Sequence, residues 1–320
     1  MAALALPVPP DMTHSVTIVG DLRMDISVQL GSYDFGPECA RYTSYRDMLV
    51  TPGGTALVMC RAFAPHFDSR HVVSAVGTDS YSESLRSAVH EVATDTTIRE
   101  VDSPNGLTVA LFRDSAGLVP KSRYSMASPR SPYLSLDRDW VHHNLTPALD
   151  SDILTMDCLL LTAPESITVA HSIAQAARLS NCLFAVDVVP HNLLDYVDRN
   201  EVVRLLAEAN LVTVELDTLA QMFGAYSQPS GTRAEAERLY RRLRPHLAQR
   251  HWVVIRFGAL NIEHSINFSS EGQSWGTDSG PEIRSGGYPS GSAISGFEYE
   301  SVVTQWKRER DTTAAEHHGR

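Results

Sequence analysis

The chain has 320 residues, of which 43% are hydrophobic and 20% are charged. This length suits one large α/β domain or a domain with a small appendage, and the composition is that of a globular protein rather than of a disordered chain. Lys and Arg number 27 against 38 Asp and Glu, a formal net charge of -11 that argues against binding to nucleic acid.

The cysteines and the first residues bear on the cellular compartment. No Cys-x-x-Cys pair occurs among Cys39, Cys60, Cys158 and Cys182, so we expect reduced thiols. Met1–Met12 lacks the basic leader of a signal peptide, and no apolar run approaches the ~20 residues that cross a bilayer. We therefore expect a soluble cytoplasmic protein with no membrane partner.

The amino-terminal half alternates strand and helix patterns. Ser15–Leu30 begins as an apolar strand, turns at a Gly-Asp pair and continues with alternating apolar and polar residues. A Pro-Gly-Gly turn precedes a helix predicted from Thr55, which is followed by a strand at Val72–Val76 and a helix with Ser80 as its N-cap. This β-α-β-α order predicts a parallel sheet with helices on both faces.

The same order continues toward the carboxyl terminus. Leu107–Asp114 is predicted to be a strand, and the polar stretch Pro120–Trp140 a loop. Short apolar strands, each preceded by helical sequence, are predicted at Leu159–Thr162, Leu183–Val189, Leu211–Glu215 and Trp252–Phe257. A helix over Thr232–Gln249 presents one apolar face, as packing against a sheet requires.

Three segments, in this order and spacing, resemble the ribokinase-like (PfkB-type) carbohydrate kinases: TIVGDLRMDISV, TPGGTALVMCRAFA and VVSAVGTDSYSESLRSAVHE. The resemblance implies a ribokinase-like three-layer α/β/α sandwich over residues 15–306, with a small β lid from strands roughly within 25–50 and 107–125. Residues 1–14 are then an amino-terminal extension and 307–320 a polar tail. The family also implies ATP and Mg²⁺ as cofactors, a sugar or nucleoside as the small-molecule partner, and dimerisation through the lid.

The resemblance implies a substrate site early in the chain. Asp25 stands where the family has an aspartate that holds sugar hydroxyls, and a carboxylate there accepts strong hydrogen bonds from two neighbouring hydroxyls. Gly53 and Gly54 match the family's Gly-Gly turn, where the backbone approaches a polar ligand without obstruction. Val58 replaces a sugar-binding asparagine of the family, and its side chain forms no hydrogen bond.

Two further segments depart from the family pattern. Leu211–Gly224 resembles the stretch with an Asn-x-x-Glu motif tied to the metal and phosphate region, but Glu215 and Thr218 fill those places here. Glu215 is still able to orient metal-bound water. Asp187 begins an Asp-x-x-Pro segment like that of the family, and it is either a site residue or a hydrogen-bonded loop carboxylate.

In the family, a Gly-Ala-Gly-Asp turn opens a late helix; its N–H groups hold the transferred phosphoryl group and its aspartate accepts the proton. Two registers fit this chain, and neither supplies the aspartate: one ends at Tyr299, and the other is Pro289–Ser292. Tyrosine is a poor base because its free pKa is about 10, and serine is worse. We prefer the first register, with Gly296 and Phe297 as the anion hole and Glu298 as the substitute base. The alternative is that Glu298 is an ordinary first-turn glutamate.

The degenerate catalytic motif and the few residues after it, which imply a shortened carboxyl terminus, leave two main functions open. The leading prediction is ATP-dependent phosphoryl transfer to a hydroxyl of a sugar or nucleoside. The alternative is a catalytically inactive ribokinase-like protein that binds such a ligand, and a third option is a non-kinase α/β protein. No metal-ligating set is predicted, because the His142-His143 and His317-His318 pairs lack ligand neighbours at suitable spacing.

Overall fold

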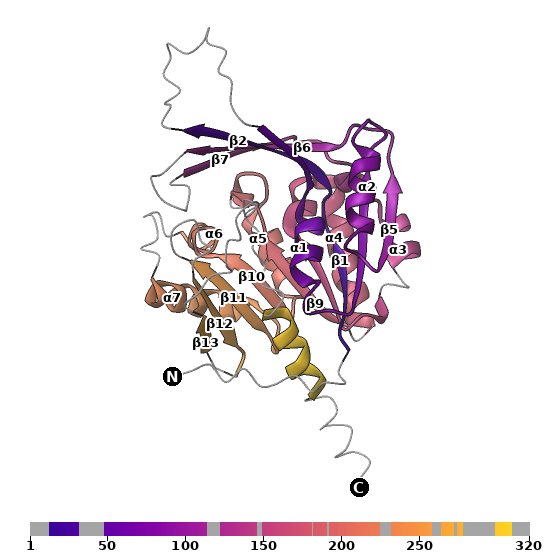
Figure 1. Cartoon of the computed structure of the whole chain (residues 1–320). Coiled ribbons are helices and arrows are strands. Elements are labelled where there is room, and N and C mark those ends of the chain that lie inside the picture. The colour runs from indigo at the N-terminus through magenta and orange to yellow at the C-terminus, as the bar shows by residue number, and fades with distance from the viewer. Residues whose placement is uncertain are drawn as a thin grey trace.

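The computed structural model describes residues 13–31, 48–113, 122–145, 149–180, 182–190, 192–224, 232–257, 264–271, 274–277 and 298–308. They form a nine-stranded sheet, a separate four-stranded sheet, and helices on both faces of the larger sheet (Figure 1). The predicted fold class, a three-layer α/β/α sandwich with a small additional β-sheet, is confirmed.

The larger sheet is mostly parallel and has the strand order β13-β12-β11-β10-β9-β8-β1-β4-β5. Its parallel strands are β1 (Ser15–Val19), β4 (Ser69–Val76), β5 (Asp95–Glu100), β8 (Ile153–Asp157), β9 (Leu183–Val188), β10 (Leu211–Glu215) and β11 (Trp252–Phe257). Two antiparallel strands extend it, β12 (His264–Ser269) and β13 (Ser274–Thr277). The central strands are almost continuously apolar because helices cover both faces.

The direction in which strands are added reverses between β1 and β8. From β1 the chain adds β4 and β5 on one side, and it then adds β8, β9, β10 and β11 on the other. In open parallel sheets such a reversal leaves a crevice at the carboxyl ends of the two strands, and ligands bind there. The topology therefore makes two residues candidates for the functional site: Asp21, just after β1, and Asp157, the last residue of β8.

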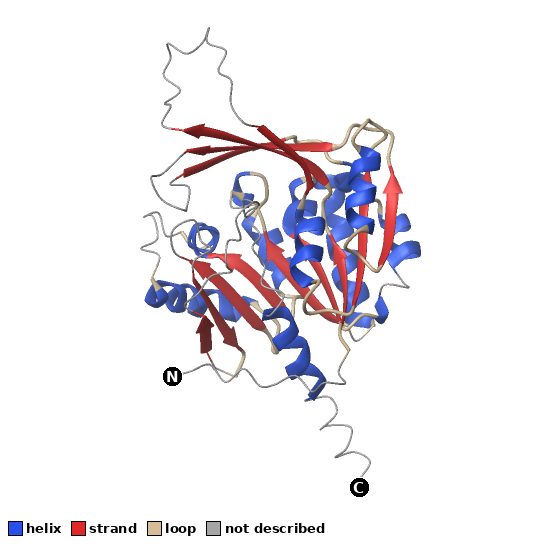
Figure 2. Cartoon of the chain, in the orientation of Figure 1, coloured by secondary structure: helices blue, strands red, loops and turns tan. Residues whose placement is uncertain are grey.

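Helices cover both faces of the main sheet (Figure 2). Two hydrophobic clusters fill the space between the sheet and these helices. One face carries α1 (Thr55–Phe63), α2 (Ser82–His90) and the helical residues 298–308. The other face carries α3 (Arg138–Leu145), α4 (Ile167–Leu179), α5 (Arg199–Leu206), α6 (Leu216–Met222) and α7 (Arg233–Leu243). Successive side chains in a strand point to opposite faces of the sheet, so neighbouring strand residues belong to different clusters.

The helix over 298–308 is tied to the amino-terminal part of the domain. The ring of Tyr299 lies 4.8 Å from that of Phe63 in α1, and the Phe63 ring lies 5.3 Å from that of Phe67. At the other end of the helix, Lys307 Nζ lies 2.8 Å from the carboxylate of Asp152, which precedes β8. Aromatic packing at one end and an ion pair at the other therefore fix this helix on the sheet.

The four-stranded sheet lies across the end of the main sheet toward which β5 and β10 run (Figure 1). Its order is β3 (Met48–Gly53), β2 (Arg23–Gly31), β6 (Gly106–Arg113) and β7 (Ser122–Ala127). Only a short turn separates β2 from β1, and β3 leads through Gly54 into α1. The small sheet is thus anchored at the point where strand order reverses.

Several predictions of secondary structure are wrong. The N-cap of α2 is Tyr81 and not Ser80, and the helix predicted over Thr232–Gln249 ends at Leu243 and is followed by a 3₁₀-helix over Arg244–His246. Leu159–Thr162, predicted as a strand, belongs to a 3₁₀-helix over Cys158–Thr162, and the strand is Ile153–Asp157 instead. Both segments are apolar, so hydrophobicity did not separate them; the carboxylate of Asp157 ends the strand by accepting a hydrogen bond from Leu159 N at 3.0 Å. The stretch Pro120–Trp140, predicted as a loop, contains β7 and the start of α3.

Two observations concern the helices and the cysteines of the described residues. None of their helices combines the length and apolarity that crossing a bilayer requires. The thiols of Cys60, Cys158 and Cys182 are buried and free, and Cys39 lies outside the described residues.

Replacing Phe63 by Ala is expected to lower the free energy of unfolding by about 3–5 kcal/mol, because it removes a buried aromatic ring and leaves a cavity. Urea denaturation measures this loss. Leu179→Ala is the control, since that side chain is 76% exposed and its loss should stay within about 0.5 kcal/mol. Similar losses in the two variants would contradict the importance of the contact between α1 and residues 298–308.

Candidate functional site

Asp25 and Gly53 are brought together by the antiparallel pairing of β2 with β3. The register sets Arg23 opposite Gly53 and Asp25 opposite Thr51. A β-carbon added to Gly53 would overlap the carboxylate of Asp25. The half-buried Asp25 side chain therefore occupies space that only a glycine at this position leaves open.

Gly54 turns the chain from β3 into α1. Its backbone has φ 91° and ψ 161°, a combination that only glycine adopts without strain. A β-carbon here would overlap the carbonyl oxygen of Asp21 and lie 3.0 Å from Arg23 N. That carbonyl accepts a hydrogen bond from Ala56 N at 3.1 Å, so the glycine turn wraps closely around the end of β1.

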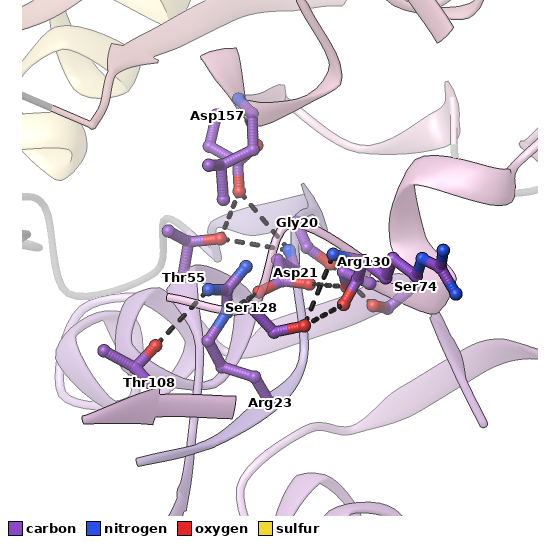
Figure 3. A network of polar contacts seen from close by, with 11 residues as sticks. Gly20, Asp21, Arg23, Thr55, Ser74, Thr108, Ser128, Arg130 and Asp157 are labelled. Carbon is purple, nitrogen blue, oxygen red and sulfur yellow. Dashed lines mark hydrogen bonds and ion pairs between the residues drawn. The ribbon is translucent and has the colours of Figure 1, made fainter. Parts of the chain in front are cut away.

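Thr55, the first residue of α1, joins the two strands at which the sheet order reverses (Figure 3). Its hydroxyl donates to the carboxylate of Asp157 and accepts a hydrogen bond from Asp21 N at 3.0 Å. Asp21 N also lies 3.3 Å from Asp157 Oδ2. One hydroxyl and one carboxylate thereby hold together the ends of β1 and β8 and the start of the helix after the glycine turn.

A buried ion pair extends this network into the four-stranded sheet. Arg23 Nε donates to the carboxylate of Asp21, and Arg23 Nη1 donates to Thr108 Oγ1 of β6 at 3.3 Å. The hydroxyl of Ser131 donates to the other oxygen of Asp21. Burial opposes the charge of Arg23, but the attraction of Asp21 prevails and raises the Arg23 pKa. These contacts fix the small sheet over the strand ends.

Asp157 has the most unusual environment of the network. Its side chain has no exposed surface. Burial raises the pKa of Asp157 to about 6 and the nearby charge of Asp21 adds to the increase, whereas the hydrogen bond from Thr55 opposes it. A carboxylate with such a pKa is ionised at neutral pH and accepts a proton more readily than an exposed aspartate does.

Glu298 lies against the antiparallel edge of the main sheet. Its carboxylate accepts hydrogen bonds from Ser265 and Asn267 of β12 and faces the guanidinium of Arg256 in β11. Burial raises the pKa of Glu298, while these three partners lower it. The residue predicted as the substitute base is therefore occupied by partners from two neighbouring strands.

Tyr299, which takes the aspartate position of the family in the preferred register, is part of the core. Its side chain is fully buried, and its hydroxyl lies 3.2 Å from Thr213 Oγ1 and 3.5 Å from Thr155 Oγ1. Burial raises the pKa of Tyr299 to about 12. A phenol in this environment stays protonated at neutral pH, so it is not a base.

Two more predicted residues share the face of the sheet that carries Asp157. Glu215, the last residue of β10, pairs with Arg256 in the strand register and is buried. Asp187 of β9 pairs with Asp157 on one side and Thr213 on the other. Across the part of the chain that the structure describes, no three or more His, Cys, Asp or Glu side chains gather closely enough to hold a metal ion.

Gly296, Phe297 and Ser292 lie outside the described residues. The assignment of the anion hole to Gly296 and Phe297 therefore stays a prediction, as does the second register that ends at Ser292. Val58 lies on α1, where its side chain offers no hydrogen-bonding group to a ligand.

Sequence reasoning missed Thr55 and Asp157. Thr55 was recognised only as a helix start, although a hydroxyl directly after a Gly-Gly turn is a signal for a polar role. Asp157 was missed because the strand was predicted one segment too late, which left this carboxylate before a strand instead of at its carboxyl end. A correct strand would have placed it beside Asp21 at the reversal point.

Comparison with known proteins gives a fold but no close relative. No family model and no curated sequence matches the chain. The structure is similar to an adenosine kinase from Sinorhizobium meliloti (TM-score 0.68, 12% identity, covering 91% of this chain and 88% of that one). It is also similar to a ribokinase from Giardia lamblia (TM-score 0.65, 15% identity, 82% and 75% covered). A fructokinase from Xylella fastidiosa with bound ATP gives a TM-score of 0.65 at 14% identity, with 92% and 83% covered. The chain thus has the ribokinase-like fold.

Gly54→Ala is expected to lower the free energy of unfolding by at least about 1–3 kcal/mol, because an alanine is strained at this φ and ψ and its β-carbon meets the Asp21 carbonyl. Thermal and urea denaturation test this. Gly106→Ala is the matched control, since its β-carbon would approach no atom closer than 3.3 Å. A variant of Gly54 as stable as the control would refute the strained turn.

The stability contributed by Asp157 should depend on pH. Its pKa is about 6 in the folded chain and about 3.9 in an unfolded one, so folding favours the protonated form. The stabilisation is fully present below about pH 4 and is lost as the pH rises through about 6, a change of about 2–3 kcal/mol. Urea denaturation from pH 4 to 7 should show this change in the wild type relative to Asp157→Asn. A constant difference between the two proteins would contradict the raised pKa.

Proposed function

We propose that this chain transfers the γ-phosphoryl group of ATP to a hydroxyl of a sugar or nucleoside. The observation that carries the proposal is the packing of the Asp25 carboxylate against Gly53, next to the point where the strand order of the main sheet reverses. A fixed carboxylate beside a bare backbone turn suits a ligand with neighbouring hydroxyls, because it accepts hydrogen bonds from both. Similar structures carry the names ribokinase, adenosine kinase and fructokinase.

The donor is inferred from those structures. One is a fructokinase with bound ATP, and another is a ribokinase from Arabidopsis thaliana complexed with ribose and ATP. Mg²⁺ accompanies ATP in phosphoryl transfer, where it neutralises charge on the phosphate oxygens and needs only one or two protein carboxylates. Glu215, a buried carboxylate at the carboxyl end of β10, has suitable donor atoms for it. Dimerisation through the four-stranded sheet remains a prediction.

A second candidate function is ligand binding without phosphoryl transfer. It is favoured by the state of the two residues that the late helix offers as bases. Tyr299 is buried with its hydroxyl against Thr155 and Thr213, and Glu298 is bound by Arg256 and β12. A protein of this kind would keep the Asp25 site and would act as a sensor or binding partner for the same small molecules.

Formation of ADP separates the two functions. Purified protein with ATP and Mg²⁺ is expected to form ADP only when an acceptor from a panel of sugars and nucleosides is present. Asp25→Asn should lower kcat/KM for that acceptor by about a hundredfold or more, because it weakens two charge-assisted hydrogen bonds. Asp139→Asn, a change at an exposed carboxylate on α3, is the control and should keep the wild-type rate.

The thermal unfolding temperature gives an independent reading of the same variants. An acceptor that raises it in the wild type and in Asp139→Asn, but not in Asp25→Asn, without any ADP formation, would support the second candidate. An acceptor-induced increase that persists in Asp25→Asn would remove Asp25 from the site under either function.

A further inference from the structure

The proposed reaction needs a group that takes the proton from the acceptor hydroxyl, and the described part of the late helix offers none that is available. The hydroxyl of Tyr299 is enclosed by Thr155 and Thr213 in the core. The carboxylate of Glu298 is held by partners from β11 and β12, and the carboxylate of Glu300 lies 2.7 Å from His66 Nδ1. Among the described residues, another element that reaches the same end of the sheet must therefore supply the base.

The carboxyl end of β8 reaches that place. Side chains two residues apart in a strand share a face, so Asp157 lies on the same face as Thr155. Thr155 Oγ1 lies 3.5 Å from the hydroxyl of Tyr299, which belongs to the first described turn of the helix over 298–308. Asp157 is therefore two residues nearer the carboxyl end of β8 than Thr155, the residue that lies next to the Tyr299 hydroxyl. This is also the side on which the helix over 298–308 begins.

Asp157 is connected to the substrate turn through Thr55. Thr55 directly follows Gly53 and Gly54, and its hydroxyl donates to Asp157 Oδ2 (Figure 3). Thr55 is partly exposed, whereas Asp157 is fully buried. The hydroxyl of Thr55 therefore stands between the carboxylate and a ligand seated at the glycine turn.

On the premise of the proposed kinase function, we propose that Thr55 and Asp157 together accept the proton of the acceptor hydroxyl. Thr55 is the residue that meets the substrate, and Asp157 is a positioning residue that acts through it. The pair takes the role that the sequence assigned to Glu298.

In the proposed step, the acceptor proton moves through Thr55 to Asp157 as the phosphoryl group is transferred. The acceptor oxygen bonds to the γ-phosphorus of ATP as the bond from that phosphorus to the β,γ-bridging oxygen breaks, and ADP leaves with the electron pair. The acceptor proton passes to Thr55 Oγ1 while the Thr55 proton passes to Asp157 Oδ2. Asp157 becomes neutral, and it returns the proton to solvent through the same hydroxyl after the product has left.

The electrostatic surroundings suit this role. The raised pKa of Asp157, about 6, lies close to neutral pH, where a general base works most efficiently. The titratable and charged groups that act on Asp157 or respond to its charge come from several elements and are Asp21, Arg23, Tyr133, Cys158 and Asp187. Among them Asp21 raises the Asp157 pKa and Arg23 offsets part of the shared negative charge.

A purely structural role for Asp157 makes a different prediction. Its Oδ1 accepts from Leu159 N and so caps the 3₁₀-helix after β8. The amide of Asn keeps one oxygen acceptor for that cap but does not ionise. Asp157→Asn therefore keeps the cap and removes proton acceptance, but its NH₂ group also replaces the oxygen that accepts from Thr55 Oγ1 and Asp21 N. The acid limb of the pH profile, rather than the loss of rate alone, therefore identifies the base.

The test measures ADP formation with the best acceptor as a function of pH in the wild type and four variants. Asp157→Asn and Thr55→Val are expected to lower kcat by about a hundredfold or more, and Thr55→Ser should stay within about tenfold because it keeps the hydroxyl. The acid limb of the wild-type profile, near pH 6, should be absent from the residual activity of Asp157→Asn. The loss in Asp157→Asn should exceed that in Glu298→Gln at least tenfold.

Three other results would overturn the proposed function, the role of Asp157 or the role of the Thr55 hydroxyl. A wild type without turnover overturns both the proposed function and this inference. Turnover in the wild type with the larger loss in Glu298→Gln, or with an unchanged acid limb in folded Asp157→Asn, leaves the kinase function standing and overturns the role of Asp157. Equal losses in Thr55→Ser and Thr55→Val, both folded by thermal denaturation, overturn the part assigned to the hydroxyl.

Discussion

The hydroxyl of Thr55 and the carboxylate of Asp157 meet where the strand order of the main sheet reverses, and the arrangement of the candidate site depends on this contact. Through it, the start of α1, the end of β1 and the end of β8 share one set of hydrogen bonds. The same set continues through Asp21 to Arg23, and so into the sheet that carries Asp25. Burying these charges costs free energy, which is offset only because each one has partners.

The fold was accessible from the sequence because its signals are local. Apolar strands, a glycine turn before α1 and the alternation of strands with helices follow directly from residue types, and they led to the correct fold class. The boundary at Ile153–Asp157 was not accessible in this way. Two apolar segments follow each other there. Ile153–Asp157 is the strand because it pairs with β1 and β9, and Asp157 accepts a hydrogen bond from Leu159 N just after it.

The residues of the candidate site show the same difference between local patterns and distant contacts. Asp25 and Gly53 lie in segments with a recognisable pattern, and the pairing of β2 with β3 brings them together. The partners of Glu298 come from β11 and β12, and the distant partners of Asp157 come from the turn after β1 and from α1. Such contacts join residues far apart in the chain, so no local pattern reveals whether a carboxylate is available to a ligand or already occupied. The three-dimensional neighbours of Glu298 argue against its predicted role as a base, whereas those of Asp157, for which no role was predicted from the sequence, favour one.

The helix over 298–308 has a consequence for the order in which the domain is made. It covers the face of β1, the first described strand, and its Lys307 donates to the carbonyl of Thr13 at 2.7 Å. The two residues are 294 positions apart in the chain, so a ribosome releases the second segment long after the first. The apolar side of the first described strand therefore stays without its final partner until residues 298–308 have emerged, and native packing of this face is completed after that point rather than step by step during translation.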